Sequence, residues 1–280
     1  MNSYNYKLSK NDWNFIDHTY CINLDTRDDR LQDINKVFEL LNIKGEVIRV
    51  KKHPTDGKIG CFESHRNIIR KSLKEGHKKI LIFEDDATPV IKNINKEVLK
   101  NIENFTKINE QWNIFFLGYL PDIKNHTIKE TSFNNIYKVN GLCTHAYIIN
   151  HNMMKIMAEM PWIGIQIDYL FSKIDNCYAI SPSLFTQGQS ISDIHNNFWD
   201  KLPKPITEKI APLFNNSITW YAHNINVPIY SSKFITSIII ATIITTTIFI
   251  KNNLNINSIT KIFLSFILWA VLLFILLKLF

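Results

Sequence analysis

The stretch that decides the fold is KILIFEDDATP, residues 79–89. Four consecutive apolar residues, 80–83, predict a buried strand, and three acids, Glu84, Asp85 and Asp86, follow it directly. Because side chains alternate along a strand, Glu84 and Asp86 are expected to face the same way. Two carboxylates held that close repel, and each raises the pKa of the other unless a cation or a basic group offsets the charge. The stretch therefore indicates either a solvated turn or a cation-binding strand end.

The sequence around this stretch alternates short apolar strands with amphipathic helices. Strands are predicted over residues 19–24, 46–50, 79–83 and 112–119, and helices over 28–42, 62–76 and 95–108. This order predicts an α/β fold with a largely parallel, doubly wound sheet. Such sheets bind ligands outside the carboxyl ends of their strands. The acids after residue 83 and the segment NLDTR, residues 23–27, fall at such ends, on strands that we expect to be neighbours.

Beyond residue 135 the pattern is less regular. A strand is predicted over 145–150, a helix over 151–160, and a short helix over 166–174 that presents Asp168. An apolar strand that begins at Cys177 then leads into a loop crowded with polar residues: Gln187, Ser190, Ser192, Asp193 and His195. This loop is either a solvated connection or a segment that closes over a ligand.

Composition limits the classes of function. The formal net charge of +7 is spread over 280 residues without an arginine-rich run, so nucleic-acid binding is not predicted. The four cysteines, Cys21, Cys61, Cys143 and Cys177, are widely spaced and form no CxxC pair. We interpret them as reduced, mostly buried thiols in a reducing compartment. Their spacing does not predict a structural zinc site.

Two long apolar runs mark the C-terminal part of the chain. Residues 234–250 contain no charged side chain, and residues 262–278 are richer in Leu and Phe. Each run has about the length of a membrane-spanning helix. We therefore expect a catalytic domain over 1–225, a linker over 226–233 and a transmembrane hairpin over 234–280, with a single tail anchor as the alternative. The N-terminus lacks the apolar core of a secretory signal, so the catalytic domain is expected to face the cytosol.

Six motifs, taken in order, resemble glycosyltransferase family 25. They are INLDTRDDR, GCFESHRNIIRKSL, LIFEDDA, THAYIIN, QIDYLF and LFTQGQSISDI, and they span roughly residues 19–195. That family includes lipopolysaccharide sugar transferases and procollagen galactosyltransferases. The resemblance implies a GT-A type fold, which is a Rossmann-like and mostly parallel sheet with flanking helices. It also implies an inverting reaction that uses a nucleotide sugar and a divalent metal. The first motif departs from the family, with Thr26 and Asp28 where arginine and proline are common.

The resemblance also implies roles for individual residues. Asp86 is the expected ligand of Mn²⁺ or Mg²⁺, with Glu84 bound through water or to the donor ribose, and His195 as a further ligand. Asp168 matches the family's aspartate in QIDYLF and is the expected general base, with Asp193 as its replacement; a plain helix N-terminal acid is the alternative for Asp168. Contacts with the UDP-sugar are expected from Asn23, Leu24, Arg27, Arg30, Ser64, His65, Glu84, Asp85, Gln187 and Ser190.

The predicted function is a metal-dependent inverting hexosyltransferase. It would move galactose or glucose from a UDP-sugar to a hydroxyl group of a glycan, a lipid-linked sugar or a protein. Two alternatives remain open: an inactive, membrane-anchored scaffold of the same fold, and a metal-dependent phosphohydrolase. A scaffold predicts broken motifs, and a phosphohydrolase requires a nucleophile or a second carboxylate cluster. The acid triplet, Asp168 and the polar loop after Gln187 are all present, which favours the transferase.

Overall fold

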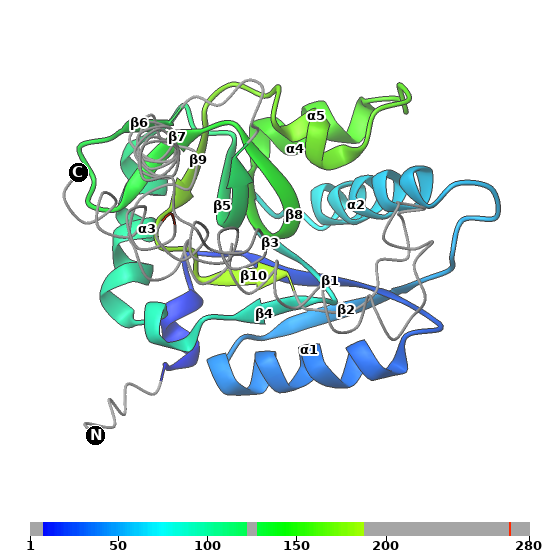
Figure 1. Cartoon of the computed structure of the whole chain (residues 1–280), viewed down its shortest axis with the longest axis horizontal. Helices are drawn as coiled ribbons and strands as arrows, with labels where there is room; N and C mark the ends of the chain where they lie inside the picture. The colour runs from blue at the N-terminus through cyan, green and yellow to red at the C-terminus, as the bar shows by residue number, and fades with distance from the viewer. Residues whose placement is uncertain (1–7, 122–127, 188–268, 270–280) are drawn as a thin grey trace, which may run out of the picture.

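The computed structural model describes residues 8–121, 128–187 and Trp269 (Figure 1). The predicted linker over 226–233 and the first predicted membrane segment over 234–250 lie outside the described residues. So does the second segment, 262–278, apart from Trp269. Ser190, Asp193 and His195 also lie outside them. Within the described part of the chain, no helix combines the length and apolar character needed to span a bilayer.

Helices and strands alternate through the described region, as the periodicity predicts. The helices are Asp28–Leu41 (α1), Gly57–Lys74 (α2), Lys96–Ile108 (α3), His151–Glu159 (α4) and Ile167–Phe171 (α5), with 3₁₀ turns at Lys10–Trp13 (η1) and Ile91–Asn93 (η2). The strands are His18–Leu24 (β1), Gly45–Val50 (β2), Lys79–Glu84 (β3), Ala87–Pro89 (β4), Ile114–Pro121 (β5), Ile128–Glu130 (β6), Ile136–Val139 (β7), Gly141–Asn150 (β8), Cys177–Ile180 (β9) and Phe185–Gln187 (β10).

The main sheet has the strand order β2-β1-β3-β8-β5-β9-β7-β6. The strand pairs β1–β2, β1–β3 and β5–β9 are parallel, whereas β8 runs antiparallel to both of its neighbours, β3 and β5. Taken together with the antiparallel pairs β6–β7 and β7–β9, these pairings show that β7 and β8 run in one direction and the other strands of the sheet run in the opposite direction. The α/β class and the mostly parallel sheet are confirmed, but the sheet is mixed because β8 separates the β1–β3 half from β5.

Both faces of this sheet are covered by helices, because its strands carry apolar side chains on both sides. On β3, Leu81 and Phe83 belong to the core that the apolar stripes of α1 and α3 complete. Ile80 and Ile82 belong to the opposite core, which α2, α4 and α5 complete. Figure 1 shows α1 and α2 on opposite sides of the sheet. The strand end after Phe83 is therefore fixed between two packed layers.

Helix α2 begins five residues earlier than the sequence pattern predicts. Its N-cap is Asp56, whose carboxylate accepts a hydrogen bond of 2.8 Å from the backbone N–H of Lys58. An aspartate in this position satisfies a backbone donor that the helix leaves unpaired. The extra turn places Cys61 inside the helix, one turn before His65.

A second, two-stranded sheet joins β4 to β10 in antiparallel register, with Gln187 opposite Ala87. Strand β10 reaches this position because Leu184 donates a backbone hydrogen bond of 2.7 Å to Leu117 of β5 and accepts one of 2.8 Å from Val90. The pairing carries Gln187 to the turn that holds the acid triplet. Local periodicity did not predict either short strand.

Candidate active site

The carboxyl ends of β1 and β3 lie side by side, as predicted, with Ile22 opposite Glu84 in the parallel ladder. The motif that follows β1 therefore meets the acid triplet. Asn23 is fully buried, and its Nδ2 donates hydrogen bonds of 2.7 Å to Asp85 Oδ2 and 3.1 Å to the carbonyl oxygen of Arg27. One amide side chain thus links the two strand ends.

Asp85 points to the α1 side of the sheet, where Arg30 meets it. Arg30 Nη1 donates a hydrogen bond of 2.8 Å to Asp85 Oδ1, and both side chains are buried. With Asn23 on its other oxygen, Asp85 has a partner for each carboxylate oxygen. Asp85 therefore orders the strand end and holds Arg30 at the site.

Asp86 lies in the turn between β3 and β4, beyond the strict alternation of the strand. Its Oδ2 accepts a hydrogen bond of 3.2 Å from Gln187 Nε2 and lies 3.8 Å from Arg30 Nη1. Its Oδ1 is buried without a hydrogen-bond partner among the described residues. Burial, and next the negative charge of Glu84, raise the pKa of Asp86 to about 7. Asp86 is thus a buried carboxylate with one oxygen that a cation would satisfy.

Glu84 points to the opposite, α2 side of the sheet. Its Oε1 accepts a hydrogen bond of 2.5 Å from Thr144 Oγ1 of β8 and lies 3.3 Å from His65 Nε2 of α2. Burial raises the pKa of Glu84, but the hydrogen bond and charge of His65, together with Thr144 and His145, outweigh burial and leave this pKa below its ordinary value. Glu84 therefore keeps its negative charge next to Asp86.

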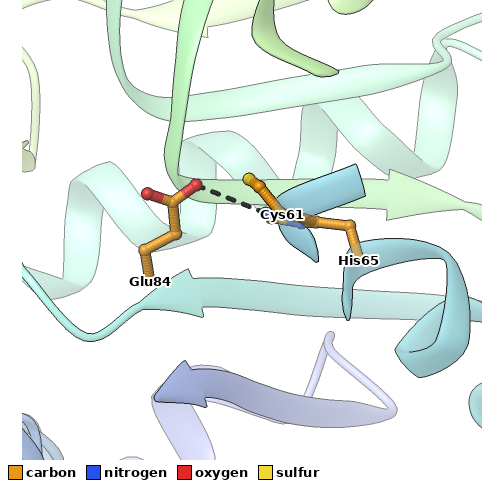
Figure 2. A group of neighbouring side chains, drawn as sticks. All are labelled: Cys61, His65 and Glu84. Atoms are coloured by element: carbon orange, nitrogen blue, oxygen red, sulfur yellow. Dashed lines mark hydrogen bonds and ion pairs between the residues drawn. The ribbon is translucent and has the colours of Figure 1, made fainter. Parts of the chain in front are cut away.

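His65 is completely buried between Glu84 and Tyr147, whose hydroxyl lies 2.8 Å from His65 Nδ1. Cys61 lies one helical turn earlier on α2. The ligand atoms of Cys61, His65 and Glu84 all lie within 4.8 Å of one another. Figure 2 shows the two α2 side chains beside the Glu84 carboxylate, with the contact between His65 and Glu84 dashed.

Asp168 belongs to the same electrostatic environment. It is half-buried in the first turn of α5, and its Oδ1 accepts a hydrogen bond of 2.7 Å from the backbone N–H of Tyr169. Burial raises the pKa of the Cys61 thiol well above its ordinary value, and the charges of Glu84, Asp168 and Asp86 raise it further. The charges of Glu84, Asp86 and Asp168 therefore all act on Cys61 near the start of α2, although Asp168 is distant in sequence from the other two.

For the remaining predicted residues, the contacts described below do not include the acid triplet. Leu24 ends β1 half-buried, and Arg27 forms an ion pair with Asp29, with Nη2 and Oδ2 2.8 Å apart. Ser64 Oγ donates a hydrogen bond of 2.6 Å to the carbonyl oxygen of Gly60 within α2. Sequence reasoning did not assign roles to Cys61, Thr144 and Tyr147. Cys61 lies in the GCFESH motif, and Thr144 and Tyr147 lie in the THAYIIN motif. Membership of these two motifs is the sequence signal that points to all three residues.

A cleft of about 480 Å³ lies beside this region, between one face of α2, from Gly60 to Lys71, and the end of β2 with the segment that follows it. It is lined partly by basic side chains and includes Ser64: Lys51, Lys52, His53, Ser64, Asn67 and Lys71. This volume falls within the range of small-molecule sites. Because Gly60 and Ser64 line the cleft while Cys61 and His65 face Glu84, one stretch of α2 borders both features.

The sequence matches a known family over part of its length. Residues 45–171 match the family described as glycosyltransferase family 25 (LPS biosynthesis protein), which is a little under half of the 280 residues. The matched segment runs from β2 to α5 and contains Cys61, His65, the acid triplet and Asp168. The chain is a glycosyltransferase. The match over residues 45–171 confirms the resemblance to family 25 seen in the motifs. No curated protein matches the chain at a significant level.

Several solved structures are similar to the chain at low identity. A protein from STIV is 14% identical, with a TM-score of 0.42, and the match covers 62% of this chain and 86% of that one. A glycosyltransferase involved in the glycosylation of the major capsid of PBCV-1 is 11% identical, with a TM-score of 0.37 and coverage of 70% and 99%. UDP-glucose pyrophosphorylase complexed with UDP-glucose is 13% identical, with a TM-score of 0.36 and coverage of 61% and 74%. These values are too low to assign a function.

Proposed function

We propose that the chain is a metal-dependent, inverting hexosyltransferase that takes galactose or glucose from a UDP-sugar. The acceptor is a hydroxyl group of a glycan, a lipid-linked sugar or a protein. The observation that carries the proposal is the meeting of the carboxyl ends of β1 and β3 with Gln187 of β10, where Asp86 keeps a buried oxygen that has no hydrogen-bond partner among the described residues. Ligands of open α/β sheets bind at this kind of edge.

The residues present fit a hard divalent cation. Mn²⁺ and Mg²⁺ prefer oxygen ligands and are commonly held by one or two carboxylates and the phosphates of the substrate. Asp86 would be the direct ligand through Oδ1, and Glu84 would act through water or hold the donor ribose. A cation there would offset the charge on the leaving diphosphate. The raised pKa of Asp86 supports this assignment, because a bound cation would offset both its causes, first the burial of the charge and then the repulsion from Glu84.

The chain's own residues would orient the donor. Arg30 is held rigidly by Asp85 and lies 3.8 Å from Asp86, so its charge is directed toward the same edge. Gln187 reaches the same oxygen of Asp86 from β10. The cleft lined by Lys51 and Lys52 has the size and charge for part of a nucleotide sugar. These groups would bind and position the UDP-sugar before transfer.

Asp168 is the proposed general base. An inverting transfer requires a group that takes the proton from the acceptor hydroxyl on the side of the sugar opposite the leaving diphosphate. Asp168 lies on a different element from the acid triplet, and its charge still acts on Cys61 beside Glu84. This arrangement supports separate donor and acceptor sides. Asp193, Ser190 and His195 retain their proposed supporting roles from the segment outside the described residues.

The experiment that tests the proposal is a screen of UDP-sugars with the purified full-length chain, with Mn²⁺ or EDTA. We expect metal-dependent binding of UDP and slow release of one hexose, which an acceptor accelerates. Release of sugar to water alone, with no acceptor giving a transfer product, would favour a phosphohydrolase or another hydrolase. UDP that neither binds nor is processed would favour the inactive scaffold.

We also propose that the apolar segments 234–250 and 262–278 attach the enzyme to a membrane with its catalytic domain in the cytosol. The support is their length and the absence from them of any charged side chain other than Lys278, the last residue of the second segment. Protease treatment of sealed membranes tests the orientation. Digestion of the domain is expected. A protected domain, or one that carries a glycan at Asn104, would contradict it.

A further inference from the structure

Three side chains of different chemistry converge on the α2 side of the sheet. Cys61 and His65 lie four residues apart on α2 and so share one helix face, while Glu84 reaches them from the end of β3 (Figure 2). Among the described residues, these three side chains form a group that could hold a metal ion, because their ligand atoms all lie within 4.8 Å of one another. We propose that Cys61, His65 and Glu84 bind a thiophilic divalent cation such as Zn²⁺.

The distances suit such an ion. His65 Nε2 and Glu84 Oε1 are 3.3 Å apart. Nitrogen and oxygen ligands of tetrahedral zinc, each about 2.0–2.1 Å from the metal, are about 3.3–3.4 Å apart. The Cys61 sulfur lies within 4.8 Å of ligand atoms of both residues, and a small inward movement of the sulfur would complete three corners of a tetrahedron. A water molecule or a substrate would take the fourth corner, as in zinc sites with three protein ligands.

The surrounding side chains already orient two of the ligands. Tyr147 contacts His65 Nδ1 at 2.8 Å, and Thr144 donates to Glu84 Oε1. When Nε2 coordinates the cation, Nδ1 carries the ring proton and donates it to the Tyr147 hydroxyl oxygen, which is the outer contact that metal-bound histidines usually make. Binding releases the thiol proton of Cys61, and any proton on His65 Nε2, to the buffer.

The ligand types separate this site from the donor-metal site proposed above, with which it shares only Glu84. A thiolate and an imidazole favour Zn²⁺ or Co²⁺, whereas Mg²⁺ and Mn²⁺ favour an all-oxygen set such as Asp86 and phosphate. Cys61 is half-buried as a residue, so the group lies close to the protein surface. Zinc binding by these three side chains does not require the proposed transfer reaction.

Cobalt titration of the purified full-length chain, kept reduced with a phosphine, tests the proposal. We expect a thiolate-to-cobalt charge-transfer band and tetrahedral visible bands, which one equivalent of Zn²⁺ removes and about a hundredfold excess of Mg²⁺ does not. Cys61→Ser should abolish the charge-transfer band and weaken Zn²⁺ binding by at least about tenfold. Cys143→Ser is the matched control and should keep the band, because Cys143 is also half-buried but lies outside the group.

Two further measurements keep the test decisive. Asp86→Asn should keep the cobalt band while it weakens Mn²⁺-dependent UDP binding, so the failure of one site is distinguishable from the failure of the other. If Cys61→Ser does not fold, alkylation of the wild-type chain replaces it: Zn²⁺ should slow the modification of Cys61, read by peptide mass spectrometry, and leave Cys143 unaffected. A wild-type chain without the band, a band that survives Cys61→Ser, or alkylation of Cys61 that Zn²⁺ does not slow would overturn the proposal.

Discussion

Arg30 donates a 2.8 Å hydrogen bond to Asp85, and the two side chains are only 10% and 7% exposed. This ion pair joins α1 to the end of β3 beneath the candidate site. Asn23 occupies the other oxygen of Asp85, so the carboxylate is held from two elements. A buried ion pair of this kind adds little net stability and mainly fixes the positions of its two side chains. Removal of one partner leaves the other charge buried without compensation.

Arg30→Met is expected to lower the free energy of unfolding by about 3–5 kcal/mol, because it leaves the buried Asp85 charge without its cation. The double variant Arg30→Met/Asp85→Asn should lose less than the two single changes add up to. Urea denaturation followed by tryptophan fluorescence measures both. Lys36→Met, which removes an exposed partner of Asp33 on the same helix, is the control and should have a much smaller effect. Strict additivity of the two buried changes would contradict this account.

Asp86→Asn is expected to stabilise the metal-free chain at alkaline pH. The folded-state pKa of Asp86, about 7, exceeds the ordinary value of 3.8, so folding favours the protonated form. The wild-type chain therefore loses stability as pH rises from about 4 to 7, and above that range the full cost of the buried charge remains. Asparagine removes this cost and keeps an acceptor for Gln187.

Thermal unfolding in EDTA at pH 5 and pH 8 measures the effect. The difference between Asp86→Asn and wild type should shift in favour of the variant at the higher pH. Added Mn²⁺ should stabilise wild type at pH 8 and have a smaller effect on the variant. A variant that is equally destabilised at both values would show that Asp86 carries no buried charge in the folded state.

Much of this architecture is encoded locally. The apolar periodicity predicts α1, α3 and the three strands β1, β2 and β3 to within a few residues, because each buries a regular face. The adjacency of β1 and β3, and with it the meeting of Asn23 with the acids, follows from the β-α-β-α-β order.

The remaining features depend on contacts that local patterns do not carry. The antiparallel pairing of β8 with β3, and the pairing of β10 with β4, join segments more than 60 residues apart. Strand alternation correctly separates Glu84 from Asp85, but the turn after β3 redirects Asp86 toward Gln187 and Arg30. Cys61 was assigned no role because the early start of α2 depends on the cap at Asp56.

Gly118→Ala is expected to lower both the stability of the chain and its affinity for the UDP-sugar donor. A Cβ at this position of β5 would overlap the carbonyl oxygen of Phe185 and Nε2 of His145. Because one of these atoms is backbone, β10 would have to move, at a cost of about 1–3 kcal/mol. Gln187 would then move away from Asp86, so Mn²⁺-dependent UDP binding should weaken as well as thermal stability. Unchanged stability would mean that β10 does not pack against Gly118 in solution.

Asp168→Asn is expected to abolish transfer without loss of donor binding. The substitution keeps an oxygen that can accept from the backbone N–H of Tyr169, so the start of α5 should be preserved. It removes the proposed general base, and turnover should fall by roughly 10²- to 10⁴-fold. Asp86→Asn should differ, because it weakens metal-dependent UDP binding and the chemical step together. Calorimetry with UDP and Mn²⁺, run beside a transfer assay, separates the two variants. If Asp168→Asn transfers sugar at the wild-type rate, another group is the base, and Asp193 becomes the first residue to replace.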